Sequence, residues 1–253
     1  MLRTRVIPVL LLSGSGLVKT VQYKKPKYIG DPVNTCKIFN ELEVDELCFL
    51  DIETTKEKRE PSFNILQEIS NECFMPLSYG GGIDSLAVAE KIFKIGFEKV
   101  VINTALFSNF SLVADIARIF GSQAVIASVD VKKNLFGKYH VCSHAGTKMH
   151  KKDPVEWIKV LEGWGVGEIL LNNIDREGTW SGFDIDLIKK VASSTILPVI
   201  AQGGAGSVSD IGKAVKDGTA SAVALGSMVV FQAREMGVLI NFPDRTILNK
   251  TIS

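Results

Sequence analysis

Short apolar runs recur along the chain, and stretches with helical spacing separate them. We expect strands near Arg5–Leu11, Glu46–Asp51, Pro76–Tyr79, Lys99–Asn103, Gln123–Asp130, Gly167–Asn172, Pro198–Gln202 and Ser221–Leu225. Most are nearly continuous apolar runs, such as Ile7 to Leu12, which is typical of strands buried on both faces of a parallel sheet. Strand–helix alternation repeated eight times predicts an α/β fold of the (β/α)₈ TIM-barrel type rather than an open sheet.

The stretch after the fifth of these strands carries clear helix signals. Asp153 stands where an N-cap is expected, Pro154 suits the first helical position, and Glu156 follows three residues after the cap. Apolar side chains then follow at helical spacing, and Gly165 can end the helix. The sequence therefore predicts a helix that begins after Asp153 and ends before Gly165.

An internal repeat supports the barrel. When the chain is shifted by 122 residues, Pro76–Phe107 aligns with Pro198–Val229 without a gap, and eight of 32 positions are identical. Shared glycines between any two βα units would explain some of these identities, but not the ungapped register over two strands and a helix. A barrel built from two related halves is the natural interpretation.

Composition bounds the class of protein. With 253 residues, 46% of them apolar, the chain fits one barrel, so we expect a single domain over residues 1–253. The net charge of +1 provides no global field for nucleic acid or an anionic membrane surface. The early apolar run is too short for a membrane span or a secretory signal. The cysteines (Cys36, Cys48, Cys73 and Cys142) lack CxxC spacing and resemble small core residues in a reducing compartment, so we expect a cytoplasmic protein.

Two glycine-rich segments follow predicted strands, where a barrel binds its ligands. They are Gly80–Ser85 and Gly203–Ser207. Glycines there let backbone N–H groups approach an anion, and the next helix N-terminus adds its dipole. Either segment alone is explained by a tight turn, but two that are related by the repeat suggest two phosphate sites. Asn103 with Thr104 and Gly226 with Ser227 can add donors, so we expect a ligand with a phosphate at both ends.

Two carboxylates, Asp51 and Asp130, end predicted strands, and Lys19 lies in the first loop. A carboxylate at a barrel mouth can transfer protons, but it can also cap a helix or pair with a lysine. Asp130 is the stronger catalytic candidate because it finishes an apolar run where nothing obvious needs a cap. The segment Asp175–Thr179 is either a polar ligand loop or a turn.

Metal and dinucleotide sites are not expected. All three histidines fall in the polar stretch 134–152, and no HExxH or CxxC motif accompanies them. That stretch is predicted to be an exposed hairpin or a flexible lid. Ser13–Gly16 lacks the third glycine and the distal acid of a dinucleotide fingerprint, so we expect no cofactor.

A family resemblance covers nearly the whole chain. It is carried by RVIPVLLL near the start, GDPV at Gly30–Val33, DELCFLDI at Asp45–Ile52, PLSYGGGI, KVVINTA, FGSQAVIASVD, GVGEILLNNIDREGT and PVIAQGGAGS. These stretches resemble HisF, the cyclase subunit of imidazole glycerol phosphate synthase. The resemblance implies a barrel that binds a bisphosphorylated ribonucleotide and forms a heterodimer with a HisH-like glutaminase. Ammonia from that partner would travel through the barrel and attack the substrate.

The resemblance also implies roles for individual residues. Asp130 matches one of the family's two acid–base aspartates, and Lys19 matches the mobile-loop lysine that contacts substrate. The implied substrate-binding set further contains Glu177, one phosphate site at Gly81, Gly82, Asn103 and Thr104, and another at Gly178, Gly203, Gly204 and Ser227. Asp51 and Gly226, placed at the mouth by the strand pattern, complete the predicted substrate-binding set. Arg5, Glu46, Lys99 and Glu168 match the ring of charges that gates the ammonia channel. Taken by itself, such a ring could simply plug the barrel with salt bridges.

Departures from the family pattern cluster at the mouth. Leu11 occupies the position of the family's other catalytic aspartate, and a lost general acid or base typically costs about 10²–10⁴-fold in rate. Glu177 replaces the usual aspartate, Gln202 a serine and Asn172 a threonine. This is the pattern expected if the substrate or reaction has changed while ammonia handling has not.

Three functions fit these observations. The first is the cyclase–lyase of histidine synthesis. The second is a HisF paralogue that activates a glutaminase and channels ammonia to a separate amidotransferase, which makes acetamidino groups on surface-polysaccharide sugars. The third is a sugar isomerase related to HisA, although that chemistry would also need the acid of the first strand. Leu11 favours the second function and whole-chain similarity the first.

Overall fold

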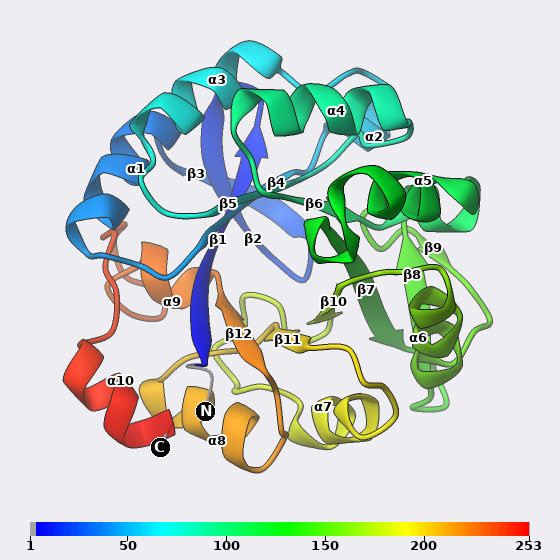
Figure 1. Cartoon of the computed structure of the whole chain (residues 1–253). Helices are drawn as coiled ribbons and strands as arrows, with labels where there is room; N and C mark the ends of the chain where they lie inside the picture. The colour runs from blue at the N-terminus through cyan, green and yellow to red at the C-terminus, as the bar shows by residue number, and fades with distance from the viewer. Residues whose placement is uncertain (1–3, 253) are drawn as a thin grey trace.

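A closed barrel of eight parallel strands is confirmed by a computed structural model, which describes residues 4–252 (Figure 1). The strands are β1 (Arg5–Ser13), β4 (Leu47–Asp51), β5 (Leu77–Gly80), β6 (Lys99–Ile102), β7 (Val125–Lys133), β10 (Glu168–Asn173), β11 (Val199–Gln202) and β12 (Ala222–Leu225). They pair in the order β10-β11-β12-β1-β4-β5-β6-β7, and β7 pairs with β10 to close the barrel. Every predicted strand is present, with its ends within three residues of those expected.

Helices connect the strands and cover the outside of the barrel (Figure 1). They are α1 (Pro32–Glu41), α2 (Thr54–Glu57), α3 (Phe63–Glu72), α4 (Leu86–Ile95), α5 (Ser111–Phe120), α6 (Pro154–Gly163), α7 (Ile185–Ala192), α8 (Val208–Lys216), α9 (Ser227–Val230) and α10 (Arg245–Ile252), with 3₁₀ turns η1 (Thr104–Phe107) and η2 (Ser122–Ala124). Helix α6 begins as predicted, because the Asp153 side chain accepts a hydrogen bond from the Val155 N–H at 2.8 Å. Within residues 4–252, none of the helices combines the length and apolar character needed to span a bilayer.

The internal repeat corresponds to matching pieces of the barrel. Strand β5, helix α4 and strand β6 align with β11, α8 and β12, with boundaries that agree within one residue after the shift. Backbone conformations also agree: Gly81 and Gly203 have φ of +123° and +100°, and Gly82 and Gly204 have +66° and +105°. The structure therefore supports two related half-barrels.

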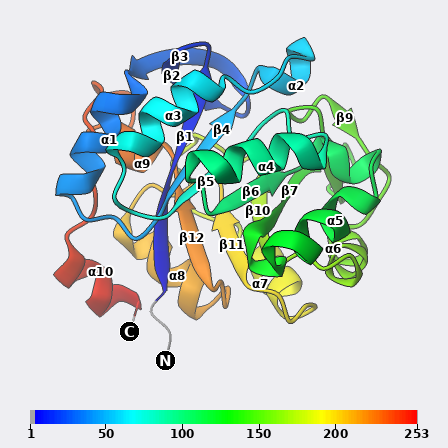
Figure 2. The same ribbon diagram turned by 45° about the horizontal axis from the view of Figure 1, so that its top comes forward.

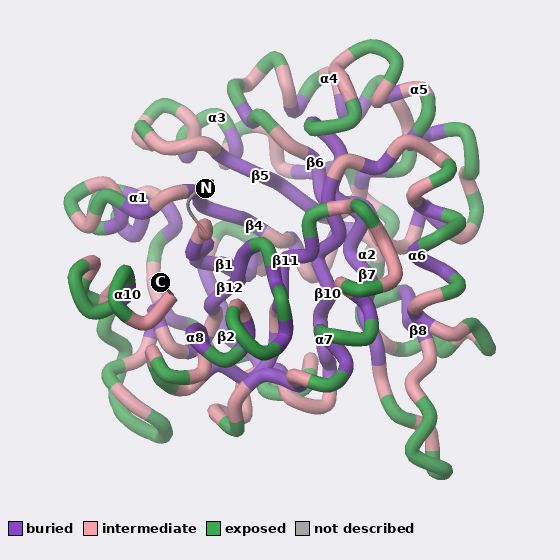
Figure 3. Tube along the Cα trace, turned by 60° about the horizontal axis from the view of Figure 1, so that its bottom comes forward, coloured by how far each residue is buried: buried purple, intermediate pink, exposed green. Residues whose placement is uncertain are grey.

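Two apolar clusters stabilise the fold, one on each face of the sheet. The larger lies between the strands and the helices and contains fully buried Phe39, Phe49 and Tyr79. The smaller lies inside the barrel and includes Ile7, Val9, Leu11, Val18, Cys48, Val101, Ile126, Leu170, Ile200, Ala222 and Ala224. Burial on both faces explains why the strands are nearly continuous apolar runs, and Figure 3 shows them buried along most of their length.

Two hairpins extend the sheet beyond the barrel. Strands β2 (Gly16–Val21) and β3 (Lys24–Gly30) form an antiparallel hairpin where the sequence predicted a loop around Lys19. Strand β8 (Tyr139–Ser143) returns antiparallel to β7 and pairs with β9 (Lys148–Met149), so the stretch 134–152 is a hairpin, and residues 141–143 are buried rather than exposed. Figure 2 shows the β2–β3 hairpin at the end of the barrel opposite the two chain ends.

Candidate active site

Four charged side chains close the end of the barrel where the strands begin. Arg5, Lys99 and Glu168 start β1, β6 and β10, and Glu46 directly precedes β4. Arg5 lies 2.6 Å from the Glu46 carboxylate and 2.8 Å from that of Glu168. Lys99 Nζ lies 3.1 Å from Glu46 and 2.9 Å from Glu168. Each cation bridges both carboxylates, so the structure brings the four predicted residues together in a closed ring of alternating charge, called the charge ring below.

Ion pairing outweighs burial in the charge ring. Burial favours the neutral carboxyl of Glu168, but hydrogen bonds from Arg5 and Lys99 hold its pKa below the usual range. Burial also disfavours the charged form of Arg5, yet hydrogen bonds to Glu168 and Glu46 raise its pKa. These two groups therefore remain charged at neutral pH, and the ring stays closed by ion pairs.

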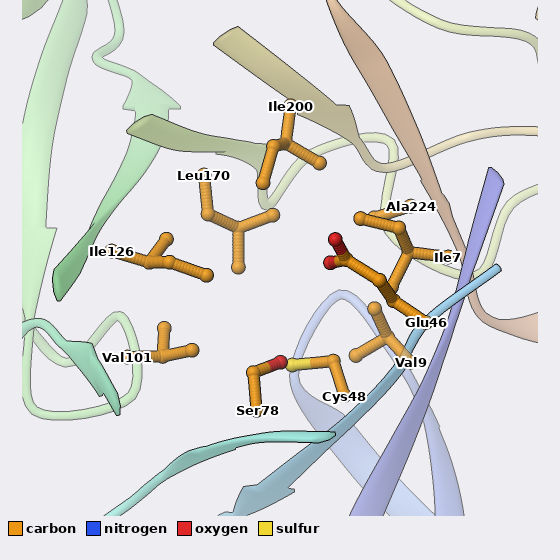
Figure 4. A pocket seen from close by; sticks show the side chains of 10 residues that line it. All are labelled: Ile7, Val9, Glu46, Cys48, Ser78, Val101, Ile126, Leu170, Ile200 and Ala224. Carbon is orange, nitrogen blue, oxygen red and sulfur yellow. The ribbon is translucent and has the colours of Figure 1, made fainter. Parts of the chain in front are cut away.

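A narrow, mostly apolar interior lies above the charge ring. Its lining comes from all eight barrel strands or the residue before them: Ile7, Val9, Glu46, Cys48, Ser78, Val101, Ile126, Leu170, Ile200 and Ala224. Figure 4 shows these side chains pointing toward one another, with the Glu46 carboxylate among them. The space they leave, about 10 Å³ for the centre of a water-sized molecule, is at the lower limit of what one such molecule needs.

Polar residues of the barrel mouth lie at least two positions further along their strands than this apolar lining. Because side chains alternate along a strand, Asn172 faces the same side as Leu170, and Gln202 the same side as Ile200. Asn172 pairs in register with Asp130 on one neighbouring strand and with Gln202 on the other. Asp130, Asn172 and Gln202 therefore form one row at the mouth.

Asp130 is held in a buried hydrogen-bond network. The carboxylate accepts hydrogen bonds from the Tyr23 hydroxyl, the Ser128 hydroxyl at 3.2 Å and the Asn172 amide. Burial raises its pKa to about 6, although these hydrogen bonds act in the opposite direction. A carboxyl group that titrates near neutral pH is suited to general acid–base work.

Lys19 and Glu177 fasten the β2–β3 hairpin over the mouth. They form a buried ion pair, and the Glu177 carboxylate also accepts hydrogen bonds from the Thr20 hydroxyl at 3.2 Å and the Tyr23 N–H at 3.1 Å. Burial lowers the pKa of Lys19 to about 7, whereas the neighbouring carboxylate favours its charged form. Lys19 and Glu177, both predicted to bind substrate, thus hold the hairpin that carries Tyr23 in place.

The first predicted phosphate site lies across two neighbouring strands. Gly81 and Gly82 follow β5, and Asn103 and Thr104 follow β6, which pairs with β5. The Asn103 amide donates to the carbonyls of Ser128 and Cys142, so it also ties β7 and β8 to this corner. The structure brings all four predicted residues together at the mouth.

The second predicted phosphate site lies across β10, β11 and β12. Gly178 permits the hairpin to dock, because a Cβ there would lie 2.5 Å from the Thr20 carbonyl oxygen. Gly203 and Gly204 follow β11, and Gly226 and Ser227 follow β12. A Cβ at Gly226 would lie 2.8 Å from Lys19 Cε, so this glycine makes room for the lysine. The five predicted residues are therefore gathered on one side of the mouth, with Lys19 beside them.

Gly204→Ala is expected to destabilise the fold by at least about 2 kcal/mol. Its φ is +105°, and a Cβ would lie 2.1 Å from the Gly182 carbonyl oxygen, so the backbone must move. Gly163→Ala is the matched control, because a Cβ at this position in α6 meets nothing within 4 Å. Alanine is also a better helix former than glycine, so this variant should not lose stability. Urea unfolding of both variants measures the difference; equal stability would contradict the steric argument.

Asp51 at the end of β4 and Leu11 near the end of β1 differ from Asp130 in their surroundings. Asp51 accepts hydrogen bonds from the backbone N–H groups of Glu53 and Thr54 and forms an ion pair with Arg59 at 3.2 Å. It therefore caps the α2 turn, one of the alternatives considered for it. Leu11 packs with the apolar interior and extends its lining to the mouth.

Tyr23 is the main site residue that sequence reasoning missed. It lies at the tip of the β2–β3 hairpin with φ of +61°, and its hydroxyl contacts both Asp130 and Asn172. No motif or spacing pointed to it, because its partners are more than 100 residues away in the sequence. The clustering of departures at Asn172 and Gln202 was the available signal for this part of the mouth. No group of three or more histidine, cysteine, aspartate or glutamate side chains within residues 4–252 is arranged to hold a metal ion.

The fold and site define a class of protein: a (β/α)₈ barrel with a charge ring at one end and a polar mouth at the other. A family model described as histidine biosynthesis protein matches residues 5–234. A Pseudomonas aeruginosa protein provisionally named imidazole glycerol phosphate synthase subunit hisF2 is 51% identical over 96% of this chain and 97% of its own length. A Vibrio vulnificus protein provisionally named subunit hisF3 is 44% identical over 100% and 97% of the two chains. The subunit HisF of Alkaliphilus metalliredigens is 39% identical over 90% of each. The chain therefore belongs to the histidine biosynthesis family, as a HisF paralogue.

Proposed function

We propose that this chain is the synthase subunit of a glutamine amidotransferase. A HisH-like glutaminase docks at the charge ring, and ammonia passes through the barrel to a bisphosphorylated ribonucleotide at the mouth. The observation that carries the proposal is that the charge ring, the narrow apolar interior and buried Asp130 follow one another along the barrel strands.

The interior suits a small neutral molecule. Its walls are largely aliphatic, and the remaining space is of the size of one water molecule. Neutral ammonia crosses such a lining at a lower desolvation cost than a cation does. Some of the four ion pairs of the charge ring must part for ammonia to enter, which gives a docked partner a means of control.

At the mouth, the two glycine loops and Asp130 support cyclase chemistry. The loops lie on opposite halves of the repeat, so they suit the two phosphates of one ligand. Asp130 then transfers protons during attack by ammonia and ring closure. The products would be imidazole glycerol phosphate and aminoimidazole carboxamide ribotide, and the substrate the bisphosphorylated formimino-carboxamide ribonucleotide. The 39% identity to a protein named subunit HisF supports this assignment.

A second candidate function is favoured by Leu11. A leucine neither donates nor accepts a proton, and here it continues the apolar lining up to the mouth. In this alternative the barrel activates its glutaminase and passes ammonia to a separate amidotransferase that forms acetamidino groups on surface-polysaccharide sugars. The barrel would then bind a phosphorylated ligand at the mouth without cyclising it.

A cyclase assay on the purified chain with its glutaminase separates the two candidates. The bisphosphorylated ribonucleotide is supplied with glutamine in one series and with excess ammonium chloride in another. Turnover in both series establishes the cyclase. Glutamine hydrolysis stimulated by the chain, without turnover of the bound ribonucleotide, establishes the ammonia-supplying subunit; absence of both turnover and glutaminase stimulation would refute both candidates.

Leu11→Asp is expected to raise ammonium-dependent turnover by about 10²-fold or more, because it restores a second acid–base group facing Asp130's side of the mouth. The native side chain is 8% exposed, so the new carboxylate is partly desolvated and costs some stability. Leu11→Asn is the control, since it adds polarity without a titrating group. Steady-state rates of the three proteins decide the matter; equal rates for the Asp and Asn variants would exclude a missing acid as the limitation.

A further inference from the structure

Two buried carboxamide oxygens at the mouth accept no hydrogen bond from the described residues. They are Asn172 Oδ1 and Gln202 Oε1. Asn172 is 2% exposed, so water does not readily compensate for its unpaired oxygen. Leaving a buried acceptor unpaired costs free energy, and such groups are rare enough in folded proteins that each calls for an explanation.

The orientation of the Asn172 side chain is set by its neighbours. Burial and the Asp130 carboxylate raise the pKa of Tyr23 well above its ordinary value, so the hydroxyl keeps its proton and donates it to Asp130. The Tyr23 oxygen must then accept, and the partner that donates to it is Asn172 Nδ2. The amide nitrogen is therefore committed to this network, and the Asn172 oxygen faces away from it.

The unpaired oxygens lie between the interior and the second glycine loop. Asn172 Oδ1 is 3.3 Å from the point where a Cβ on Gly203 would stand, so this oxygen lies against the glycine loop. Gln202 directly precedes that glycine and pairs in register with Asn172. Both buried oxygens therefore lie where the interior and the glycine loop adjoin, which are the two sides from which a donor would approach them.

The chemistry of this row selects a donor. Carboxamide oxygens and a carboxylate only accept hydrogen bonds, whereas a hydroxyl can rotate to donate. Three acceptors stand in one row, and the amide nitrogen of Asn172 is already engaged, so the Gln202 amide nitrogen is the one side-chain donor left among these three residues. Such a row matches a nitrogen that carries two or more hydrogens better than an oxygen that carries one.

We propose that Asn172, Gln202 and Asp130 form an acceptor subsite for a nitrogen bearing several N–H bonds. This inference rests on the proposed function, which brings such a nitrogen to the mouth from two sources. One is ammonia emerging from the interior; the other is an amino or amide nitrogen of the bound ribonucleotide. The subsite holds this nitrogen beside Asp130 and so determines which nitrogen reacts.

Gln202→Met tests the subsite on the full-length chain, since methionine nearly matches glutamine in shape and lacks the acceptor. Melting temperatures are recorded against ammonium chloride, against tetramethylammonium chloride, which has no N–H donor, and against the bisphosphorylated formimino ribonucleotide. In the native chain, ammonium or the ribonucleotide is expected to raise the melting temperature beyond the tetramethylammonium baseline. In Gln202→Met, the half-saturating concentration of that ligand is expected to rise about tenfold.

Controls separate ligand recognition from folding. Gln202→Met without ligand is expected to melt at or above the native temperature, because an unpaired buried acceptor is removed. Gln202→Glu keeps oxygen acceptors and should retain the response, and Gln67→Met, on the exposed face of α3, should behave as the native chain does.

The arms of the experiment identify the source and the failure. A weakened ammonium response assigns the subsite to ammonia, and a weakened ribonucleotide response assigns it to the ligand nitrogen. Unchanged responses in Gln202→Met, or no response of the native chain to either ligand, would overturn the proposal. If the chain still stimulates its glutaminase in those cases, the proposed function stands without the subsite. If Gln202→Met weakens a response but the chain does not stimulate a glutaminase, the subsite stands and the proposed function fails.

Discussion

Replacing Asp130 by asparagine is expected to lower ammonium-dependent turnover by about 10²–10⁴-fold while the protein stays folded. Asp130 is the titrating carboxylate in the mouth row, and Leu11 offers no substitute. Asparagine keeps the shape and still accepts from Tyr23, but it cannot take up a proton. Initial rates with saturating ammonium chloride measure the loss.

The pH dependence gives an independent check on Asp130. Its carboxylate must be ionised to act as a base, and burial raises its pKa to about 6, so the native rate should fall below about pH 6. For stability the sign is opposite: the folded-state pKa lies above the ordinary value, so Asp130 contributes stability that is lost as the pH rises through about 6. Asp130→Asn should therefore be at least as stable as the native chain at pH 8.

A rate that survives in Asp130→Asn would contradict the acid–base assignment. Tyr23→Phe is the matched variant, since it removes the hydroxyl that contacts Asp130 and leaves the carboxylate in place. Its rate profile should shift along the pH axis rather than collapse.

Arg5→Ala is expected to break the charge ring and the coupling to glutamine together. Arg5 bridges Glu46 and Glu168, and its removal leaves both carboxylates to share Lys99. We expect a loss of about 3 kcal/mol, at the low end for breaking a buried ion pair, because the Arg5 side chain keeps 26% of its surface exposed. Denaturant unfolding measures the loss.

The functional readout is the ratio of glutamine-dependent to ammonium-dependent turnover. If the barrel does not cyclise, the readout is the ratio of glutamine hydrolysis to the product of the separate amidotransferase. That ratio should change severalfold in Arg5→Ala, because the ring no longer closes the entrance. Arg118→Ala is the stability control: its ion pair with Asp115 spans 3.7 Å on the surface, where the contribution is about 0–1 kcal/mol. If Arg5→Ala is destabilised but its coupling of glutamine hydrolysis to turnover is unchanged, the charge ring serves only to plug the barrel.

Arg5→Ala should also change how the stability of the protein depends on pH in the acidic range. The pKa of Glu168 is held below its ordinary value, so its ion pairs contribute stability that is present above that value and is lost as the pH falls through the lowered pKa. Arg5→Ala should therefore lose less stability than the native chain does over this acidic range.

The parts of the molecule that follow from local patterns were predictable. A strand buried on both faces must be apolar along its length, so runs such as Ile7 to Leu12 located the strands within a few residues. The charge ring was also predictable once the strands were placed, because Arg5, Lys99 and Glu168 begin strands, and parallel strands of a barrel begin at the same end. The glycine loops followed from the repeat for the same reason.

The mouth is different, because its arrangement depends on contacts between distant segments. Asp51 ends a strand, and only the tertiary structure shows that its carboxylate caps the α2 turn and pairs with Arg59. Lys19 could have been in a loop, but pairing of β2 with both β1 and β3 placed it in a strand that reaches Glu177.

Local patterns were enough to predict the barrel, its internal repeat, the charge ring and the glycine loops, since each depends on alternation or spacing within a strand and its loop. The contact of Tyr23 with Asp130 and the unpaired oxygens of Asn172 and Gln202 became evident only in the folded chain. The reason is physical: whether a buried polar atom finds a partner depends on which distant hairpin docks beside it, and no local pattern encodes that docking.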